Sequence, residues 1–241
     1  MKQGTRIHPT ALVSDEAMLA DNVEVGPYAI VHAGVRLARG VRIDAYAVIG
    51  GDPQDLAFEG GATGLEIGPD TVVREGAILH RATTADSPTR IGARCLIMGQ
   101  THIGHDCQVG DHVTIAQQAG LAGHVVVEEH AVIGGMAGVH QHVRIGRHAM
   151  VGGMAKVTRD VLPFFAVDGH PATHRSLNAV GLRRAGIPPA EYRALREAFQ
   201  QLRNGGEPNE ETGMVGHLVK FLGAHSKRGI TPFRRSPAGG A

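Results

Sequence analysis

The decapeptide THIGHDCQVG, residues 101–110, brings His102, His105 and Asp106 together in a region otherwise made of aliphatic and small residues. Histidine is the side chain best suited to transferring a proton near neutral pH. A carboxylate beside it orients the imidazole ring and stabilises its charged form. In an arbitrary protein such a pair is more often a plain surface feature, so it predicts general-base chemistry only where other polar groups converge on it.

A six-residue repeat predicts the scaffold that positions these side chains. Of the 26 positions at every sixth residue from Ile7 to Val157, 23 are Ile, Leu or Val. Four residues after each of them, 23 of 26 positions hold Ala, Val, Thr or Cys, and both Cys95 and Cys107 fall in this column. The period fits neither an amphipathic helix nor an alternating strand, but it is the hexapeptide signature of a parallel β-helix. We therefore expect both cysteines to be buried free thiols.

The repeat resembles that of the left-handed hexapeptide proteins, in which three hexapeptides form one triangular coil of about 18 residues. Successive coils stack at about 4.8 Å, the spacing of adjacent strands, so residues 18 apart are neighbours. The side chains that this rule stacks at one corner are Asp106, His124 and His142, and those beside them are His105, Gly123 and Gln141. His102 lies across the same corner and His80 belongs to an earlier coil.

These residues suit acyl transfer to a hydroxyl or an amine. Gly123, one coil beyond His105, is placed to offer a backbone N–H to an oxyanion formed near that histidine. Cys107 belongs to the inward column and no serine nucleophile is apparent. We therefore expect direct attack by the acceptor, without an acyl-enzyme.

A second column of histidines, His112, His130 and His148, is expected on another face of the prism. Its simplest interpretation is polar decoration exposed to solvent. The alternative is a zinc site, because stacked imidazoles can converge on a metal. The lack of an accompanying carboxylate weakens that alternative.

The repeat is interrupted over residues 50–66 and 81–90, which we expect to be loops projecting from the prism. It stops after about Asp168, and three helices are predicted over residues 172–186, 188–204 and 212–224. The chain is thus predicted to be mainly β, with a parallel β-helix at 1–170 and a small helical domain at 171–241. The helical part carries 11 Lys and Arg against 5 Asp and Glu, which favours an acidic partner.

Composition excludes several classes of protein. No stretch of about 18 apolar residues and no apolar segment of signal-peptide length occurs, so we expect a cytoplasmic protein without a membrane span. Two cysteines are too few for a disulfide framework. We expect no nucleic-acid partner.

The segments HIGHDC, AGHVVVEEHAVIGGMAGVHQ, VGGMAKV and HSKRGIT, together with PQDL and ILHRAT, resemble the UDP-N-acetylglucosamine acyltransferases that begin lipid A synthesis. The resemblance implies a homotrimer with active sites between neighbouring prisms. It also implies an (R)-3-hydroxyacyl donor carried on the phosphopantetheine of acyl carrier protein, with no other cofactor and no metal. His105 would be the general base, Asp106 its assistant and Gly123 the oxyanion donor.

The same resemblance assigns substrate contacts. The residues matched to positions lining the nucleotide-sugar and acyl sites are Gln54, Asp55, His80, His102, His124, His140 and Gln141. Asn178 and Arg184 match nucleotide contacts on the helical tail, and Gly153 matches the position that limits acyl-chain length. A glycine there implies room for a longer chain.

The chain also departs from the family pattern. Ala57, Val180 and Ala185 stand where lysine, glutamate and arginine are usual. These changes fall on acceptor recognition, so the acceptor is left open among UDP-GlcNAc, its 3-amino analogue and another nucleotide sugar, and with it O- or N-acylation.

Three other functions fit the same repeat. An acetyl-CoA-dependent sugar acetyltransferase would use the scaffold with a different donor. A zinc lyase similar to the hexapeptide carbonic anhydrases would require a bound metal. A trimeric binding scaffold without turnover would account for the missing basic and acidic residues.

Overall fold

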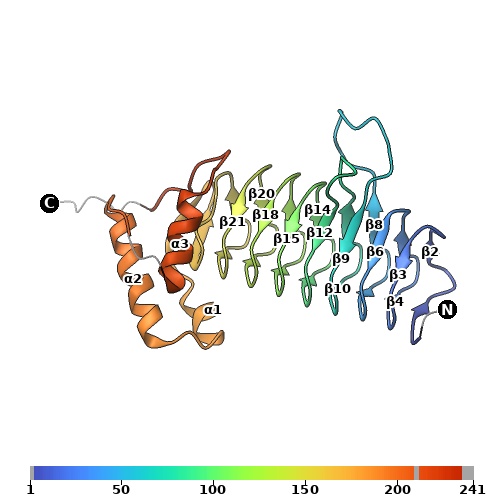
Figure 1. The fold of residues 1–241 in the computed structure, drawn as a ribbon, viewed down its shortest axis with the longest axis horizontal. Coiled ribbons are helices and arrows are strands. Elements are labelled where there is room, and N and C mark those ends of the chain that lie inside the picture. The colour runs from blue at the N-terminus through green and yellow to red at the C-terminus, as the bar shows by residue number, and fades with distance from the viewer. Residues whose placement is uncertain (1–2, 209–211, 235–241) are drawn as a thin grey trace.

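The computed structural model describes residues 3–208 and 212–234, and its main body is a three-sided prism of short parallel strands (Figure 1). The first sheet contains β1 (Arg6–Ile7), β4 (Glu24–Val25), β7 (Arg42–Ile43), β10 (Val72–Val73), β13 (Leu96–Ile97), β16 (Thr114–Ile115), β19 (Val132–Ile133), β22 (Met150–Val151), β24 (Phe165–Gly169) and β25 (Ala172–Leu177). The second contains β2 (Leu12–Val13), β5 (Ile30–Val31), β8 (Val48–Gly51), β11 (Ile78–His80), β14 (His102–Ile103), β17 (Gly120–Leu121), β20 (Gly138–Val139) and β23 (Lys156–Val157). The third contains β3 (Met18–Leu19), β6 (Val35–Leu37), β9 (Leu65–Ile67), β12 (Thr89–Ile91), β15 (Gln108–Val109), β18 (Val126–Val127) and β21 (Arg144–Ile145).

From β1 to β24, consecutive strands belong to different sheets, and strands one coil apart pair in parallel. His102 pairs with Gly120 and Gly120 with Gly138, at the spacing that the repeat predicts. The left-handed β-helix predicted from the sequence is therefore confirmed.

The aliphatic column and the small-residue column of the repeat together fill the prism. Ile97, Ile103 and Ile115 are fully buried, and so is Cys107 of the second column. Both cysteines are free thiols in this core, as predicted, and burial raises the pKa of Cys107 to about 12. A narrow prism accepts only such aliphatic and small side chains, which explains the scarcity of aromatic residues.

The corners impose an unusual backbone. Asp106, His124 and His142 have φ values of 59°, 60° and 61°, in the left-handed region. Asp, Asn and His enter this region more readily than other non-glycine residues. The glycine before the corner meets a different limit, because a Cβ on Gly104 would lie 2.8 Å from the backbone nitrogen of Gly123.

Two coils are longer than the others. A regular coil pairs residues 18 apart, such as His102 with Gly120. The first long coil pairs residues 30 apart, Val35 with Leu65, and the second pairs residues 24 apart, Val72 with Leu96. Both longer coils exceed the regular length by a multiple of the hexapeptide, so the six-residue count survives across them although the regular stacking offset does not. The longer insertion projects from the prism between β8 and β9, as the sequence predicts (Figure 1).

The tail differs in part from the prediction. Residues 172–177, expected to be helical, form β25, which pairs antiparallel with β24. Ala172 and His174 of β25 face inward while Thr173 and Arg175 are less buried, an alternation that suits a strand. The helices are α1 (Ala179–Arg184), α2 (Pro189–Arg203) and α3 (Gly213–Gly223).

The helices cover one end of the prism and close a second core (Figure 1). The side chains that form this core include Phe164, Phe165, Leu182, Leu195, Phe199 and Leu218. It therefore supplies the aromatic packing that the prism lacks. No helix within the described residues is both long and apolar enough to cross a bilayer.

Candidate functional site

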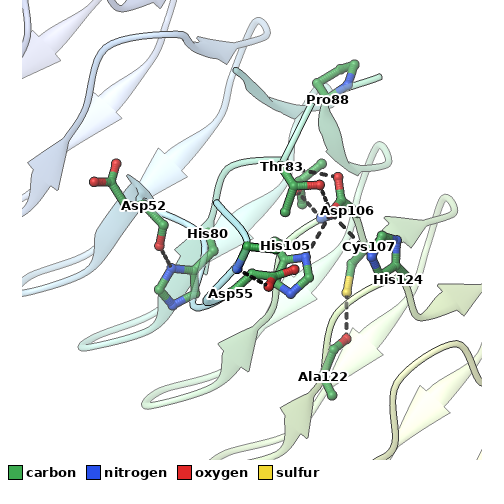
Figure 2. Close-up of polar contacts among 12 residues, drawn as sticks. Asp52, Asp55, His80, Thr83, Pro88, His105, Asp106, Cys107, Ala122 and His124 are labelled. Carbon is green, nitrogen blue, oxygen red and sulfur yellow. Dashed lines mark hydrogen bonds and ion pairs between the residues drawn. The ribbon is translucent and has the colours of Figure 1, made fainter. Parts of the chain in front are cut away.

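His105 and Asp106 form a hydrogen-bonded pair at the corner between the second and third sheets, here called the His105 corner (Figure 2). The Nδ1 of His105 lies 2.7 Å from Oδ2 of Asp106. The His105 side chain is 5% exposed and that of Asp106 13%. Because Nδ1–H donates to the carboxylate, the Nε2 of a neutral His105 carries the lone pair.

Two threonines hold Asp106. Thr83 donates its backbone N–H to Oδ1 (3.0 Å) and its hydroxyl to Oδ2 (2.8 Å). The N–H of Asp106 donates to Oγ1 of Thr89 at 2.8 Å. Burial alone would raise the pKa of Asp106, but the hydrogen bonds from His105 and Thr83 outweigh it, so this pKa lies below its ordinary value. Asp106 is therefore a carboxylate at neutral pH.

The ring of His105 lies directly against Gly123 on the next coil. A Cβ at Gly123 would overlap the Cε1 and Nε2 atoms of the ring. Gly123 is buried, and within the described residues its N–H donates no hydrogen bond. A buried N–H without a partner, on a residue in contact with the His105 ring, is a candidate donor to an oxyanion.

His124 and His142 continue the corner as predicted. The rings of His124 and His142 stack at 4.6 Å, and the ring of His105 meets that of His124 edge-on at 5.1 Å. Burial lowers the pKa of His124 and His142, and positive Lys227 adds to both shifts. Both histidines are consequently neutral near pH 7.

His80 and His102 form a second pair of rings, at 5.0 Å. Nδ1–H of His80 donates to the carbonyl of Asp52 at 2.6 Å. The Nε2 atoms of both rings are buried and have no hydrogen-bond partner among the described residues. Burial, followed by the charge of His80, lowers the pKa of His102. The two rings thus present unpartnered nitrogens to a polar ligand.

Asp55 comes from the 50–66 insertion, and its carboxylate lies close enough to the His105 corner for its charge to act on the pKa of His124, which burial lowers (Figure 2). Asp55 Oδ1 accepts a hydrogen bond from the Ala57 N–H, and Gln54 is exposed. Arg81 holds the insertion in place, because its guanidinium pairs with Asp52 at 2.7 Å and donates to the Gly61 carbonyl at 3.1 Å.

A shallow groove of about 380 Å³ runs along the second sheet from His102. Its floor is open because the outward-facing positions after His102 are Gly120 and Gly138, and a Cβ at either would touch nothing. His140 and Lys156 line its far end. Gln141, beside His140, is exposed.

Three predicted site residues lie elsewhere on this chain. Asn178 caps α1, accepting from the Gly181 N–H, and donates to the carbonyl of His148 at the corner between the third and first sheets. Arg184 is exposed at the end of α1, and Gly153 is exposed at the corner between the first and second sheets. The chain alone does not bring them to His105.

The second histidine column is present as predicted. His112, His130 and His148 stack at 4.6 Å with nearly parallel rings. Burial lowers the pKa of His148 to about 4, with His130 adding to the shift. Among the described residues, the group whose ligand atoms lie close enough for a metal, within 4.8 Å, is instead His105, Asp106 and His124.

Sequence reasoning missed Thr83, Thr89, Arg81 and Lys227. In the sequence the two threonines are members of the small-residue column, which gives no hint of their contact with Asp106. The only related feature of the sequence was the break in the repeat at 81–90, which predicts a loop but not what that loop contacts.

Comparisons with known proteins place this geometry in a family. Residues 160–231 match the family model described as UDP N-acetylglucosamine O-acyltransferase, domain 2, and residues 88–123 match bacterial transferase hexapeptide repeats. The acyl-(acyl-carrier-protein)-UDP-N-acetylglucosamine O-acyltransferase of Alkalilimnicola ehrlichii is 40% identical, over 94% of this chain and 99% of its own length.

Solved structures agree. The UDP-N-acetylglucosamine acyltransferase of Campylobacter jejuni is 31% identical with a TM-score of 0.81, over 95% of this chain and 100% of that chain. The UDP-N-acetylglucosamine O-acyltransferase of Moraxella catarrhalis is 34% identical with a TM-score of 0.76, over 93% and 99%. The chain therefore belongs to the UDP-N-acetylglucosamine O-acyltransferase family.

Proposed function

We propose that the protein transfers an (R)-3-hydroxyacyl chain from acyl carrier protein to the 3-position of a UDP-amino sugar, the first step of lipid A synthesis. The observation that carries this proposal is the His105 ring, bound to Asp106 through Nδ1 and lying against Gly123 at Nε2. The relatives' names support the acyl-carrier-protein donor over acetyl-CoA. Both substrates are soluble, which suits a cytoplasmic enzyme.

The proposed reaction uses two groups, Nε2 of His105 as the base and the N–H of Gly123 as the donor to the oxyanion. The Nε2 of His105 accepts the proton of the sugar hydroxyl while the sugar oxygen forms a bond to the thioester carbonyl carbon. The carbonyl oxygen becomes an oxyanion, and the N–H of Gly123 donates to it. When the C–O⁻ group collapses, the carbon–sulfur bond breaks and the imidazolium returns its proton to the pantetheine thiolate. Asp106 stabilises the imidazolium between these steps.

Direct attack of the acceptor on the thioester is favoured because Cys107, the thiol nearest to His105 in the sequence, is unsuitable as a nucleophile. Cys107 is fully buried, its Sγ donates to the Ala122 carbonyl at 3.2 Å, and burial raises its pKa to about 12. A thiol in this state has almost no thiolate at neutral pH and does not face the groove.

The sugar is placed by the groups around His105. Asp55 and Gln54 come from the insertion, while His80 and His102 offer buried free nitrogens to sugar hydroxyls or phosphate. Ala57, Val180 and Ala185 are all exposed. Losing charged side chains at exposed positions weakens ion pairing with the nucleotide, not the acyl transfer itself. UDP-GlcNAc and its 3-amino analogue are the two acceptors to compare.

A homotrimer completes the site in this proposal. Asn178 and Arg184 lie by one corner of the prism, Gly153 at a second and His105 at the third. A neighbouring prism packed against the His105 corner supplies the nucleotide contacts that this chain does not place there. The acyl chain then follows the groove past Gly120 and Gly138 toward Gly153, with His140 and Gln141 at its edge.

One experiment tests the proposal. The purified protein is incubated with UDP-GlcNAc or its 3-amino analogue and with 3-hydroxyacyl carrier protein of several chain lengths, or with acetyl-CoA, and products are identified by mass spectrometry. We expect a mono-acylated UDP sugar from the carrier-protein donor. Product from acetyl-CoA alone, or from no donor, would contradict the proposal.

A further inference from the structure

Thr83 contacts both oxygens of the carboxylate that holds His105. Its backbone N–H donates to Oδ1 of Asp106 at 3.0 Å and its hydroxyl donates to Oδ2 at 2.8 Å. Oδ2 is the oxygen that accepts from Nδ1 of His105 at 2.7 Å. With each oxygen held by one donor of the same residue, the carboxylate plane has a single orientation.

The insertion at 81–90, which makes this coil six residues longer than a regular one, folds around Asp106. The segment at 81–90 leaves the prism and returns at β12, where the Thr89 hydroxyl accepts from the Asp106 N–H at 2.8 Å. Between Thr83 and Thr89 in the sequence, the carbonyl of Pro88 accepts a hydrogen bond from Nε2 of Gln108 at 2.9 Å. Figure 2 shows Thr83 and Pro88 above the corner that carries Asp106. The insertion is thus tied at three points to the coil that carries the His105 pair.

Asp106 needs such support for two reasons. Its backbone φ of 59°, shared with the equivalent corner residues, fixes only the direction of the Cα–Cβ bond and leaves the carboxylate free to rotate about its side-chain torsions. Its carboxylate is also largely buried, where a charge is costly unless hydrogen bonds satisfy it. The hydroxyl of Thr83 meets both needs at Oδ2, the oxygen that faces the imidazole.

We propose that Thr83 is a positioning residue for the reaction: by holding Oδ2 of Asp106 it fixes the His105 ring with its Nε2 lone pair beside Gly123. This role rests on the proposed function, because it has a catalytic consequence only if His105 is the base. Thr83 touches no reacting atom. Its effect belongs to the turnover step, while the sugar contacts at Asp55 and His102 are unchanged by its loss.

The test compares three variants in the carrier-protein assay, with kcat and the acceptor KM measured separately. Thr83→Val keeps the shape and the backbone N–H but removes the hydroxyl, and we expect kcat to fall about tenfold or more with an acceptor KM within about twofold of wild type. Thr83→Ser keeps the hydroxyl and should recover most of kcat. Thr84→Val alters the exposed neighbour on the same loop and should leave both constants unchanged.

A double-variant cycle covers the case in which Thr83→Val folds poorly. Thr83→Ala removes the hydroxyl without adding bulk, and it is measured in the wild type and in Asp106→Asn. If Thr83 acts through the Asp106 carboxylate, its loss costs much less in the Asp106→Asn background. Equal costs in both backgrounds would overturn the inference, as would a wild-type kcat for Thr83→Val or a failure of Thr83→Ser to recover activity. An inactive wild type would instead count against the proposed function.

Discussion

The Cα of Gly123 lies so close to the His105 ring of the preceding coil that a methyl group at position 123 would overlap the ring atoms Cε1 and Nε2. Glycine is thus required there by the approach of an imidazole, not by backbone angle, because Gly123 does not have a positive φ. The same contact places residue 123, whose N–H donates no hydrogen bond within the described residues, against the edge of the ring that carries Nε2.

Gly123→Ala therefore tests how closely the base and the oxyanion donor are matched. The added methyl must displace the ring, and we expect kcat to fall by about a hundredfold, as removal of an oxyanion donor does in other enzymes. Steady-state kinetics and the unfolding temperature are measured together. Gly223→Ala, at the end of α3 and away from the groove, is the control, because a Cβ there touches nothing. Full activity in Gly123→Ala would show that the ring is not held against this glycine during turnover.

Gly153→Met tests the position proposed to limit acyl length. Gly153 is exposed, and a Cβ there would lie 3.4 Å from the Gly135 carbonyl, a contact that needs little adjustment. If the acyl chain runs from the groove toward Gly153, as proposed, a long side chain there should shift preference toward shorter acyl donors. The measurement is kcat/KM across 3-hydroxyacyl chains of increasing length. An unchanged chain-length profile in a normally folded variant would rule out Gly153 as the ruler.

His174 links the prism to the C-terminal segment, and we expect protonation of its ring to lower the stability of the protein. Its Nδ1–H donates to the Thr231 carbonyl at 2.8 Å, and its Nε2 accepts from the Leu162 N–H at 3.0 Å. Only the neutral ring makes both bonds, and burial lowers the pKa of His174 to about 4. The unfolded chain, with a histidine pKa of about 6.5, binds the extra proton more readily.

Stability from His174 is therefore complete above about pH 6.5 and is lost as the pH falls toward 4, by about 3 kcal/mol in total. Urea unfolding between pH 7.5 and 4.5 measures this slope. His174→Gln should flatten it, because an amide can accept and donate at the same two positions without titrating. His148→Gln is the comparison, because that half-buried histidine titrates over the same range. An equally steep slope in His174→Gln would assign the acid sensitivity to other groups.

Much of the scaffold follows from two columns of the sequence. The six-residue count gives the strand register, the buried cysteines and the corner that stacks Asp106, His124 and His142, because each regular coil repeats the last by simple translation. The contacts of Thr83 and Arg81 do not follow, because they arise in the two longer coils, where that translation fails. The first part of the helix expected over 172–186, residues 172–177, is a strand because its pairing with β24, a tertiary contact, decides its conformation.

The repeat of a single chain also does not predict how residues of different prisms would combine into one site. Asn178 and Arg184 are assigned to the nucleotide by resemblance, yet the fold places them by a different corner from His105. Their spacing in the sequence carries no information on which prism they serve. A proposed neighbouring copy reconciles the assignment with the fold.

The most direct measurement of the central claim is the turnover of His105→Ala with the carrier-protein donor, alongside the oligomeric mass of the variant. His130→Ala, which alters a histidine at another corner, serves as the control. The account predicts that His105→Ala loses at least about a hundredfold in kcat while its oligomeric mass equals that of wild type, and that His130→Ala remains active. A His105→Ala protein that retains most of its turnover would contradict the assignment of His105 as the base.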